Sequence, residues 1–190
     1  RHNDDVARLP RLSLALQSVW SGVTVDQVTA EIRAFRPDVI HVHNTFPLIS
    51  PSLYWAAARL RVPVVQTLHN FRLLCPQAMF LREGRVCEDC LGHLPWRGVI
   101  RRCYRNSLTQ TAVLAGMLVT HETLGTFKNK IARYIALSEF SRGRFVAGGL
   151  PAEKIVVKPN FVSGEIPGRG HAVLCDEQAG SSGRSGFLFV

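Results

Sequence analysis

The chain has 190 residues, 46% of them hydrophobic and 19% charged, which argues against a disordered protein and indicates one globular domain with loosely structured ends. No apolar run approaches the roughly 18 to 20 residues that span a bilayer, so the sequence also argues against a transmembrane protein. Lysine and arginine outnumber the acidic residues by 23 to 14, and the formal charge of +9 favours an anionic partner. The chain opens on Arg1 without an apolar signal sequence, so we expect a missing N-terminus and no secretion signal.

The first predicted elements are a helix and a βαβ unit. The helix begins at the capping-box pattern Thr24-Val25-Asp26-Gln27 and ends before Pro37. The β-branched run 38–43 predicts a strand, Ser50-Pro51 starts a helix that ends near Leu60, and residues 63–68 predict a second strand. Because βαβ units lie in parallel sheets, we expect a parallel α/β domain.

The rest of the chain continues this pattern after a long interruption. Residues 71–98 predict a loop of about 28 residues, long enough to require a functional or stabilising explanation. We then expect a mainly helical segment, a strand, a helix and a fourth strand over residues 99–129, 131–137, 139–148 and 155–158. The first domain would therefore cover residues 1–162. Residues 163–186, rich in glycine and serine, predict a linker, and residues 187–190 predict the first strand of a second, truncated domain.

Polar residues follow three of the predicted strands. The pairs are His43-Asn44, His69-Asn70 and Ser138-Glu139. Ligands bind at the carboxyl ends of strands in open parallel sheets, because loops and helix N-termini converge there. An imidazole at His69 would be partly buried, with a pKa suited to proton exchange near neutrality. The alternatives are that His69 makes its hydrogen bonds within its own loop and that Glu139 only caps a helix.

Four of the five cysteines follow the series Cys75-x11-Cys87-x2-Cys90-x12-Cys103, in which Cys87 and Cys90 have the spacing of a zinc knuckle. A structural zinc ion would explain how the long loop stays ordered. Reduced cysteines in or near the core, and disulfides in an oxidising compartment, are the alternatives. Cys175 stands apart in the predicted linker.

A basic stretch follows the cysteine knuckle. It combines four arginines with two aromatic residues: Trp96, Arg97, Arg101, Arg102, Tyr104 and Arg105. This composition is typical of a surface that binds an anionic bilayer, and a solvated helix face is the alternative. No GxGxxG, Walker, HExxH or GxSxG motif occurs, so dinucleotide binding, P-loop hydrolysis and serine hydrolysis lack support.

Two runs of the sequence, PDVIHVHNTFPLISPSLYWAAARLRVPVVQTLHNFRLLCP and YIALSEFSRGRFVAGGLPAEKIVVKPNFV, resemble the N-terminal domain of the family 4 glycosyltransferases of the GT-B fold. The resemblance covers roughly residues 1–162, with strand, loop and helix motifs in the family's order. It implies a Rossmann-like sheet flanked by helices, one half of a GT-B fold and here incomplete at both ends. The complete enzyme would transfer a sugar from a nucleotide-sugar with retention of configuration.

The resemblance also implies roles for single residues. It places His69 against the reacting sugar, and it keeps Asn160 as a ligand contact although residues 161–163 depart from the family's Asn-Gly-Val-Asp segment. The strand-end residues complete the set of expected binding residues: His43, Asn44, Asn70, Ser138 and Glu139. The glycine-rich first strand and the C-terminal domain that holds the donor diphosphate are absent from the sequence, so we expect the chain alone to have little or no activity.

The resulting expectation is a hexosyltransferase that needs no cofactor for catalysis. Its partners would be a UDP- or GDP-sugar, bound mainly by the missing domain, and a glycan or lipid-linked acceptor in surface polysaccharide or glycolipid assembly. We expect it in the cytoplasm, peripheral at the inner face of the membrane, with no nucleic-acid partner. The alternatives are a non-catalytic zinc-bearing interaction module from a degenerate gene and a GT-B nucleotide-sugar epimerase.

Overall fold

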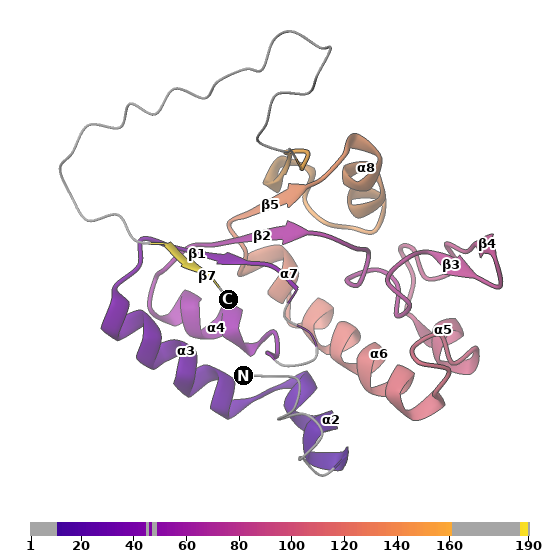
Figure 1. Ribbon diagram of the computed structural model, residues 1–190, viewed down its shortest axis with the longest axis horizontal. Coiled ribbons are helices and arrows are strands. Elements are labelled where there is room, and N and C mark those ends of the chain that lie inside the picture. The colour runs from indigo at the N-terminus through magenta and orange to yellow at the C-terminus, as the bar shows by residue number, and fades with distance from the viewer. Residues whose placement is uncertain (1–10, 45, 47–48, 161–186, 190) are drawn as a thin grey trace, which may run out of the picture.

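The computed structural model describes residues 11–44, 46, 49–160 and 187–189 of the chain. One sheet of parallel strands, in the order β6-β5-β2-β1-β7, forms its centre (Figure 1). The strands are β1 (Val39–Val42), β2 (Val64–Leu68), β5 (Arg133–Ala136), β6 (Ile155–Val157) and β7 (Phe187–Phe189). The predicted parallel α/β domain is therefore confirmed, and the strands expected from the periodicity all lie in this sheet.

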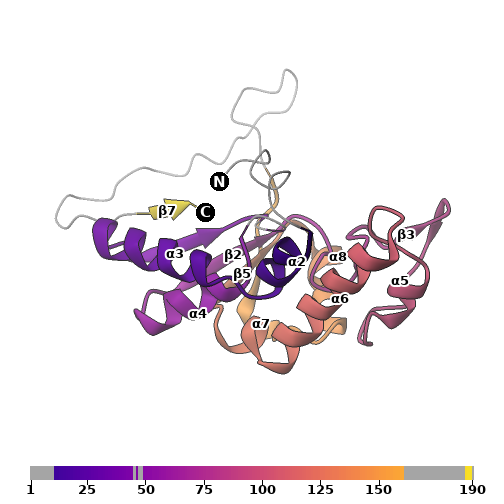
Figure 2. The ribbon, with the colours of Figure 1, turned by 90° about the horizontal axis from the view of Figure 1, so that it is seen from below.

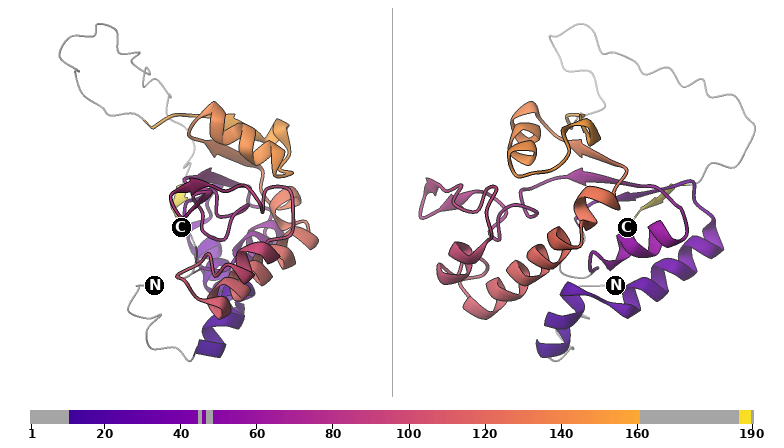
Figure 3. Two further views of the ribbon diagram at one scale, coloured as in Figure 1. Left: turned by 90° about the vertical axis from the view of Figure 1, so that its right-hand side faces the viewer. Right: turned by 180° about the vertical axis from the view of Figure 1, so that it is seen from behind.

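Helices form the crossovers between neighbouring strands. They are α4 (Ser52–Arg59) after β1, α6 (Leu108–Thr123) and α7 (Thr126–Asn129) after β2, and α8 (Glu139–Ala147) after β5. The helix α3 (Gly22–Phe35) packs against α4, and α2 (Arg11–Val19) packs against α6. Figures 2 and 3 show α4, α6 and α7 on the same face of the sheet. Since each crossover is right-handed in such folds, successive crossovers in one direction cover one face.

Burial along β1 and β5 alternates with a period of two, as expected when one face packs against helices. The central strand β2 is buried at every position except Val65. The strand residues buried against the helices are Ile40, Val42, Val64, Tyr134 and Ala136. His41, Val65 and Ile135 occupy the alternate positions and are only half-buried. The core therefore lies between the sheet and its helical layer, and His41 of β1 lies on the other face.

The start of α3 differs from the prediction. Ser21 is the N-cap, because its Oγ accepts the Thr24 N–H at 3.1 Å, and the helix begins at Gly22 rather than at the expected capping box. The Ser21 N–H in turn donates to Ser50 Oγ at 3.1 Å, and Ser52 Oγ donates to the Ser21 carbonyl. A contact between segments about 30 residues apart thus selects the cap, which a local pattern does not reveal.

The predicted loop and the helical segment after it form a lobe over residues 71–106, which extends beyond the end of the sheet (Figure 1). The lobe contains the hairpin of β3 (Leu81–Arg82) and β4 (Arg85–Val86) and the short helix α5 (Trp96–Ile100). The helix predicted over residues 99–129 is broken twice, by left-handed residues at 102, 105 and 106 and by Gly125 with φ +66°.

Residues 187–189 pair in parallel with β1, with Ile40 opposite Leu188. The predicted linker, including Cys175, lies outside the described residues. The expectation that residues 187–190 begin a second domain therefore stays a prediction. Of the helices in the described ranges, none has the length and apolar character needed to cross a bilayer.

Candidate functional site

Side chains at the carboxyl ends of β1 and β2 contact one another in three pairs, each 26 positions apart. The pairs are His41 Nε2 with Thr67 Oγ1 at 2.8 Å, His43 Nδ1 with His69 Nε2 at 2.7 Å, and Asn70 Nδ2 with Asn44 Oδ1 at 3.1 Å. In the backbone register of the two strands, the residues that lie opposite each other are fewer positions apart in the sequence, as Val42 and Gln66 show. Each β1 side chain therefore reaches two positions beyond its strand partner, toward the ligand-binding edge of the sheet. Four of the predicted site residues thus form one cluster.

The two strand-end histidines, His43 and His69, are joined by a single hydrogen bond between their rings. Their rings lie 5.0 Å apart between centroids and are tilted by 28°. His69 is exposed, so the expected partial burial of its imidazole is wrong. Partial desolvation of the ring, and then the charge that His43 would carry, hold the pKa of His69 below its ordinary value. Burial also lowers the pKa of His41, with further lowering by His43, His69 and Lys158. A neutral imidazole at His69 is therefore favoured at neutral pH, and it can accept a proton or a hydrogen bond.

A cavity of about 100 Å³ opens at this edge of the sheet, beside His43 and His69. Its inner wall contains a buried hydrogen bond, in which the Tyr54 hydroxyl donates to Gln66 Oε1 at 2.9 Å. Burial raises the pKa of Tyr54 far above its ordinary value, so the phenol stays a neutral donor. The cavity is therefore lined by this neutral phenol–amide pair and by the imidazole of His69.

Arg72 supplies a cation to this cavity and was not expected from the sequence. Its guanidinium lies 5.0 Å from the ring centroid of Tyr104 and 5.7 Å from that of Phe46. Its Nη1 donates to the Pro76 carbonyl, and its backbone N–H donates to Asn70 Oδ1 at 3.0 Å. These contacts fix the side chain where it can meet an anionic or hydroxyl-rich ligand. The one signal in the sequence is its place three residues after His69.

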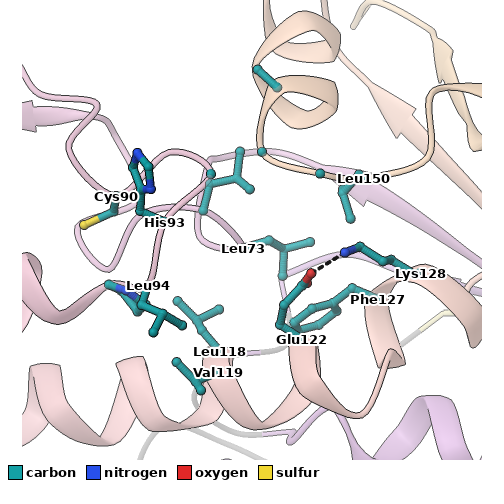
Figure 4. A pocket seen from close by; sticks show the side chains of 16 residues that line it. Leu73, Cys90, His93, Leu94, Leu118, Val119, Glu122, Phe127, Lys128 and Leu150 are labelled. Atoms are coloured by element: carbon teal, nitrogen blue, oxygen red, sulfur yellow. Dashed lines mark ion pairs between the residues drawn. The ribbon is translucent and has the colours of Figure 1, made fainter.

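A larger cavity of about 420 Å³ adjoins the first one, and Leu73 and Phe127 line both. Figure 4 shows apolar side chains of α6 and of the loop at residue 73 around it, with the carboxylate of Glu122 meeting the ammonium of Lys128. Cys90 lies on the opposite side of the opening. The two cavities together offer a polar part at the strand ends and a mostly apolar part beside α6.

The other predicted binding residues lie at the same edge of the sheet but line neither of these cavities. Ser138 is the N-cap of α8, with its Oγ accepting the Ser141 N–H at 3.1 Å, as the sequence predicted. The Glu139 carboxylate lies 3.9 Å from the Arg142 guanidinium, and Asn160 is exposed after β6. Their roles as ligand contacts stay predictions.

The four cysteines of the predicted zinc series are free thiols that line one small cavity in the lobe: Cys75, Cys87, Cys90 and Cys103. Burial raises the pKa of Cys90 and of Cys103, and the neighbouring cysteines raise it further, because thiolates close together repel. Within the described ranges, no three His, Cys, Asp or Glu side chains already stand in a metal-holding arrangement. The disulfide alternative has no support among these four residues.

The model of glycosyltransferase family 4 matches residues 2–165, far more than half of the 190-residue chain. The chain belongs to glycosyltransferase family 4. Comparisons with curated proteins and with solved structures found no match. Membership of family 4 confirms the resemblance seen in the sequence, and with it a Rossmann-like half of a GT-B fold and a function of the glycosyltransferase type. A sugar donor and an acceptor are the general partners of such a family 4 domain.

Proposed function

We propose that this family 4 domain is the acceptor-binding half of a retaining glycosyltransferase that uses a nucleotide-sugar, and that His69 contacts the reacting sugar. The observation that carries the proposal is the hydrogen-bonded pair of His43 and His69 beside a cavity at the carboxyl edge of the sheet. Ligands bind at this edge in open parallel sheets. A neutral imidazole held there can exchange hydrogen bonds with sugar hydroxyl groups as charge develops in the transition state.

His43 would then be a positioning residue. Its Nδ1 engages His69 Nε2, so it restricts rotation of the His69 ring and leaves the other ring nitrogen of His69 to face ligand. A ring held in one orientation keeps its reactive nitrogen within hydrogen-bond reach of a bound hydroxyl. Asn44 and Asn70 extend the same polar surface, and Ser138, Glu139 and Asn160 are further candidates for sugar contacts at this edge.

The acceptor we propose is a glycan or a lipid-linked sugar of surface polysaccharide or glycolipid assembly. The polar cavity suits a sugar, and the larger cavity beside it suits an apolar portion, because Leu73, Leu118 and Phe127 line its wall. For such an acceptor we propose a peripheral position at the inner face of a membrane. The basic stretch that starts at Arg97 would provide the attraction to anionic lipid.

The donor would be a UDP- or GDP-sugar held mainly by a facing second domain. Stabilisation of the leaving diphosphate is a large part of such catalysis, and we therefore expect little transfer by this chain alone. The groups that hold the donor diphosphate would belong to that second domain.

The experiment measures sugar transfer from a panel of UDP- and GDP-sugars to glycan and lipid-linked acceptors, with the complete reading frame and with this chain alone. We expect transfer by the complete protein, and a loss of about a hundredfold or more in kcat/KM for His69→Ala. His171→Ala, outside the described residues, is the control that keeps full activity. An active His69→Ala variant would refute the role of His69. Ordinary transfer rates by this chain alone would refute the proposal that it forms only half of the active site. Formation of an epimerised donor without acceptor would favour the epimerase.

A further inference from the structure

Four cysteines from separate segments of the lobe converge on one cavity. Cys75 follows the loop after β2, Cys87 follows β4, Cys90 lies in the next turn, and Cys103 follows α5. The cavity has a volume of about 10 Å³, which is too small for a sugar and close to the space of one water molecule or ion. Spans of 11 and 12 residues separate the outer cysteines from the central pair, so the fold and not the local sequence brings them together.

The backbone around these thiols is fixed by hydrogen bonds. The Cys87 N–H donates to the Phe80 carbonyl at 2.8 Å, and the Cys103 N–H donates to the Gly98 carbonyl at 3.0 Å. The Gly98 N–H donates to the Cys90 sulfur, an arrangement that lowers the charge on a metal-bound thiolate. Gly98 is buried, and a Cβ there would lie 3.0 Å from the Pro76 side chain and 3.6 Å from the Cys90 sulfur. A glycine at this position permits the close approach.

Two arginines line the same cavity. The Arg101 Nη1 lies 3.8 Å from the Cys87 sulfur, and Arg101 also pairs with Asp89. The Nε of Arg82 is buried and has no hydrogen-bond acceptor in the part of the chain that is described. The Arg82 guanidinium also pairs with Glu83 at 3.0 Å. A divalent cation bound by four thiolates carries a net charge of −2, which these two guanidinium groups, each with a carboxylate partner, would offset in part.

From this convergence we propose that Cys75, Cys87, Cys90 and Cys103 bind one structural zinc ion. The sulfurs are not yet at ligand positions, since the described residues contain no assembled metal group. Zinc binding would require rotation about χ1, which moves each sulfur between staggered positions while the backbone stays in place. Each thiol gives up its proton to the solvent as its sulfur–zinc bond forms, and four thiolates complete a closed tetrahedral site.

The lobe has a physical need for such a cross-link. Six of the eight described non-glycine residues with positive φ lie in it: Ala78, Phe80, Glu83, Arg102, Arg105 and Asn106. Each such residue costs free energy, and the conformation persists only where surrounding contacts impose it. The start of the lobe joins the domain core through Leu74, Ala78 and Phe80. Farther out its apolar side chains are exposed, with Val86 at 79% and Ile100 at 66% exposure, so the outer part of the lobe has little core of its own. Sulfur–zinc bonds would replace the missing core.

The zinc ion would also brace the candidate site. Tyr104, whose ring lies against the Arg72 guanidinium, directly follows Cys103. Cys90 lines the larger cavity. Loss of the metal would therefore loosen one wall of each cavity. The inference does not depend on the proposed transferase activity, because a structural site has no open position for substrate.

The test is metal analysis of the purified protein under reducing conditions, without contact with a metal-affinity resin. We expect about one zinc ion per chain, lost in the Cys87→Ser/Cys90→Ser double variant and kept in Cys175→Ser, the matched control outside the lobe. Less than about half an equivalent in the wild type after zinc is supplied would overturn the proposal. A zinc content that survives the double variant, or that Cys175→Ser abolishes, would overturn the assigned ligands.

Thiol counting on the wild-type protein keeps the proposal testable if the double variant does not fold. Of the five thiols, we expect one to react quickly with a thiol reagent and four to react only after a chelator removes zinc. Replacement by Co²⁺ should give the strong charge-transfer absorption of a tetrahedral thiolate site. Immediate reaction of all five thiols, or a non-reduced mass that reveals disulfides, would contradict the zinc site.

Discussion

The Nδ1 atom of His43 lies 2.7 Å from the Nε2 atom of His69, across the carboxyl ends of two adjacent parallel strands. One nitrogen must donate a hydrogen and the other must accept it, so two fully protonated rings would place two hydrogens in the same space. The pair therefore resists double protonation. It links the ionisation of His69 to a residue 26 positions away in the sequence.

Replacement of His43 should raise the pKa of His69. Partial desolvation by neighbouring groups is the larger cause of the lowered pKa and the charge of His43 is the second, and His43→Ala reduces both. Activity that requires neutral His69 should therefore begin to rise at a higher pH in this variant. NMR titration of the imidazole signals measures the shift, and His93→Ala, an exposed histidine in the lobe, should leave the His69 curve unchanged. An unchanged or lower pKa in His43→Ala would contradict the coupling.

Stability should fall on acidification because of His121, which is fully buried between α2 and α7. Its Nε2 donates to the Val19 carbonyl at 2.8 Å, so Nδ1 accepts from Thr126 Oγ1 at 2.9 Å. Thr126 Oγ1 is itself the acceptor of the Trp55 indole N–H. A second proton on His121 would therefore remove the acceptor that the Thr126 hydroxyl uses.

Burial lowers the pKa of His121 below its ordinary value, and its hydrogen bond to Val19 raises it by less. The unfolded chain then binds more protons than the folded chain, so the free energy of unfolding is highest above about pH 6.5 and decreases as the pH falls below it. Urea unfolding at several pH values measures this slope. His121→Gln should flatten the slope and cost about 1 to 3 kcal/mol, whereas His93→Ala should keep it. An equal slope in all three proteins would exclude His121 as the cause.

The stacking of Arg72 on Tyr104 should stabilise the lobe. The guanidinium lies 5.0 Å from the ring centroid and Arg72 is half-buried, so we expect a coupling of about 0.5 to 2 kcal/mol. A double-mutant cycle of Arg72→Ala and Tyr104→Ala, followed by urea unfolding, measures it. The same cycle on exposed Arg97 and Trp96, whose contact is 5.4 Å, should give a smaller value. Equal coupling energies for the two pairs would show that burial of Arg72 does not strengthen its contact with Tyr104.

Binding to anionic lipid vesicles should depend on the basic stretch of the lobe. Two of its arginines already have partners, since Arg101 pairs with Asp89 and Arg105 lies over Tyr104. Each arginine near the surface contributes about 1 kcal/mol, so glutamine at all four positions should weaken binding by about a hundredfold or more. Vesicle sedimentation measures this for the set Arg97, Arg101, Arg102 and Arg105. The matched control replaces four exposed arginines of α3 and α4 and their ends: Arg33, Arg36, Arg59 and Arg61. Equal loss in both sets would indicate a response to net charge alone.

Local patterns predicted the elements that local interactions stabilise. The β-branched runs are strands, Ser138 caps α8, and the helix stops at Gly148, because propensity and capping act within a few residues. The prediction was wrong where a distant contact decided the outcome. Ser21 rather than Thr24 caps α3, because Ser50 holds its backbone N–H.

The candidate site was predicted in part for the same reason. Strand ends identify His43 and His69, since the end of a strand is visible in the sequence. Arg72 was missed, because its place beside the cavity depends on Tyr104 and Phe46, each more than 20 residues away along the chain. The same limit left the cysteine series undecided between zinc and core packing.

The sequence by itself determined the class of fold and the family, because period, capping and motif order are short-range properties repeated along the chain. The tertiary structure alone decided which side chains meet. It joined His43 to His69 across a 26-residue span and gathered four thiols around one cavity. Such contacts depend on strand register and on the path of the lobe, which packing of the whole domain sets and no short stretch of sequence specifies.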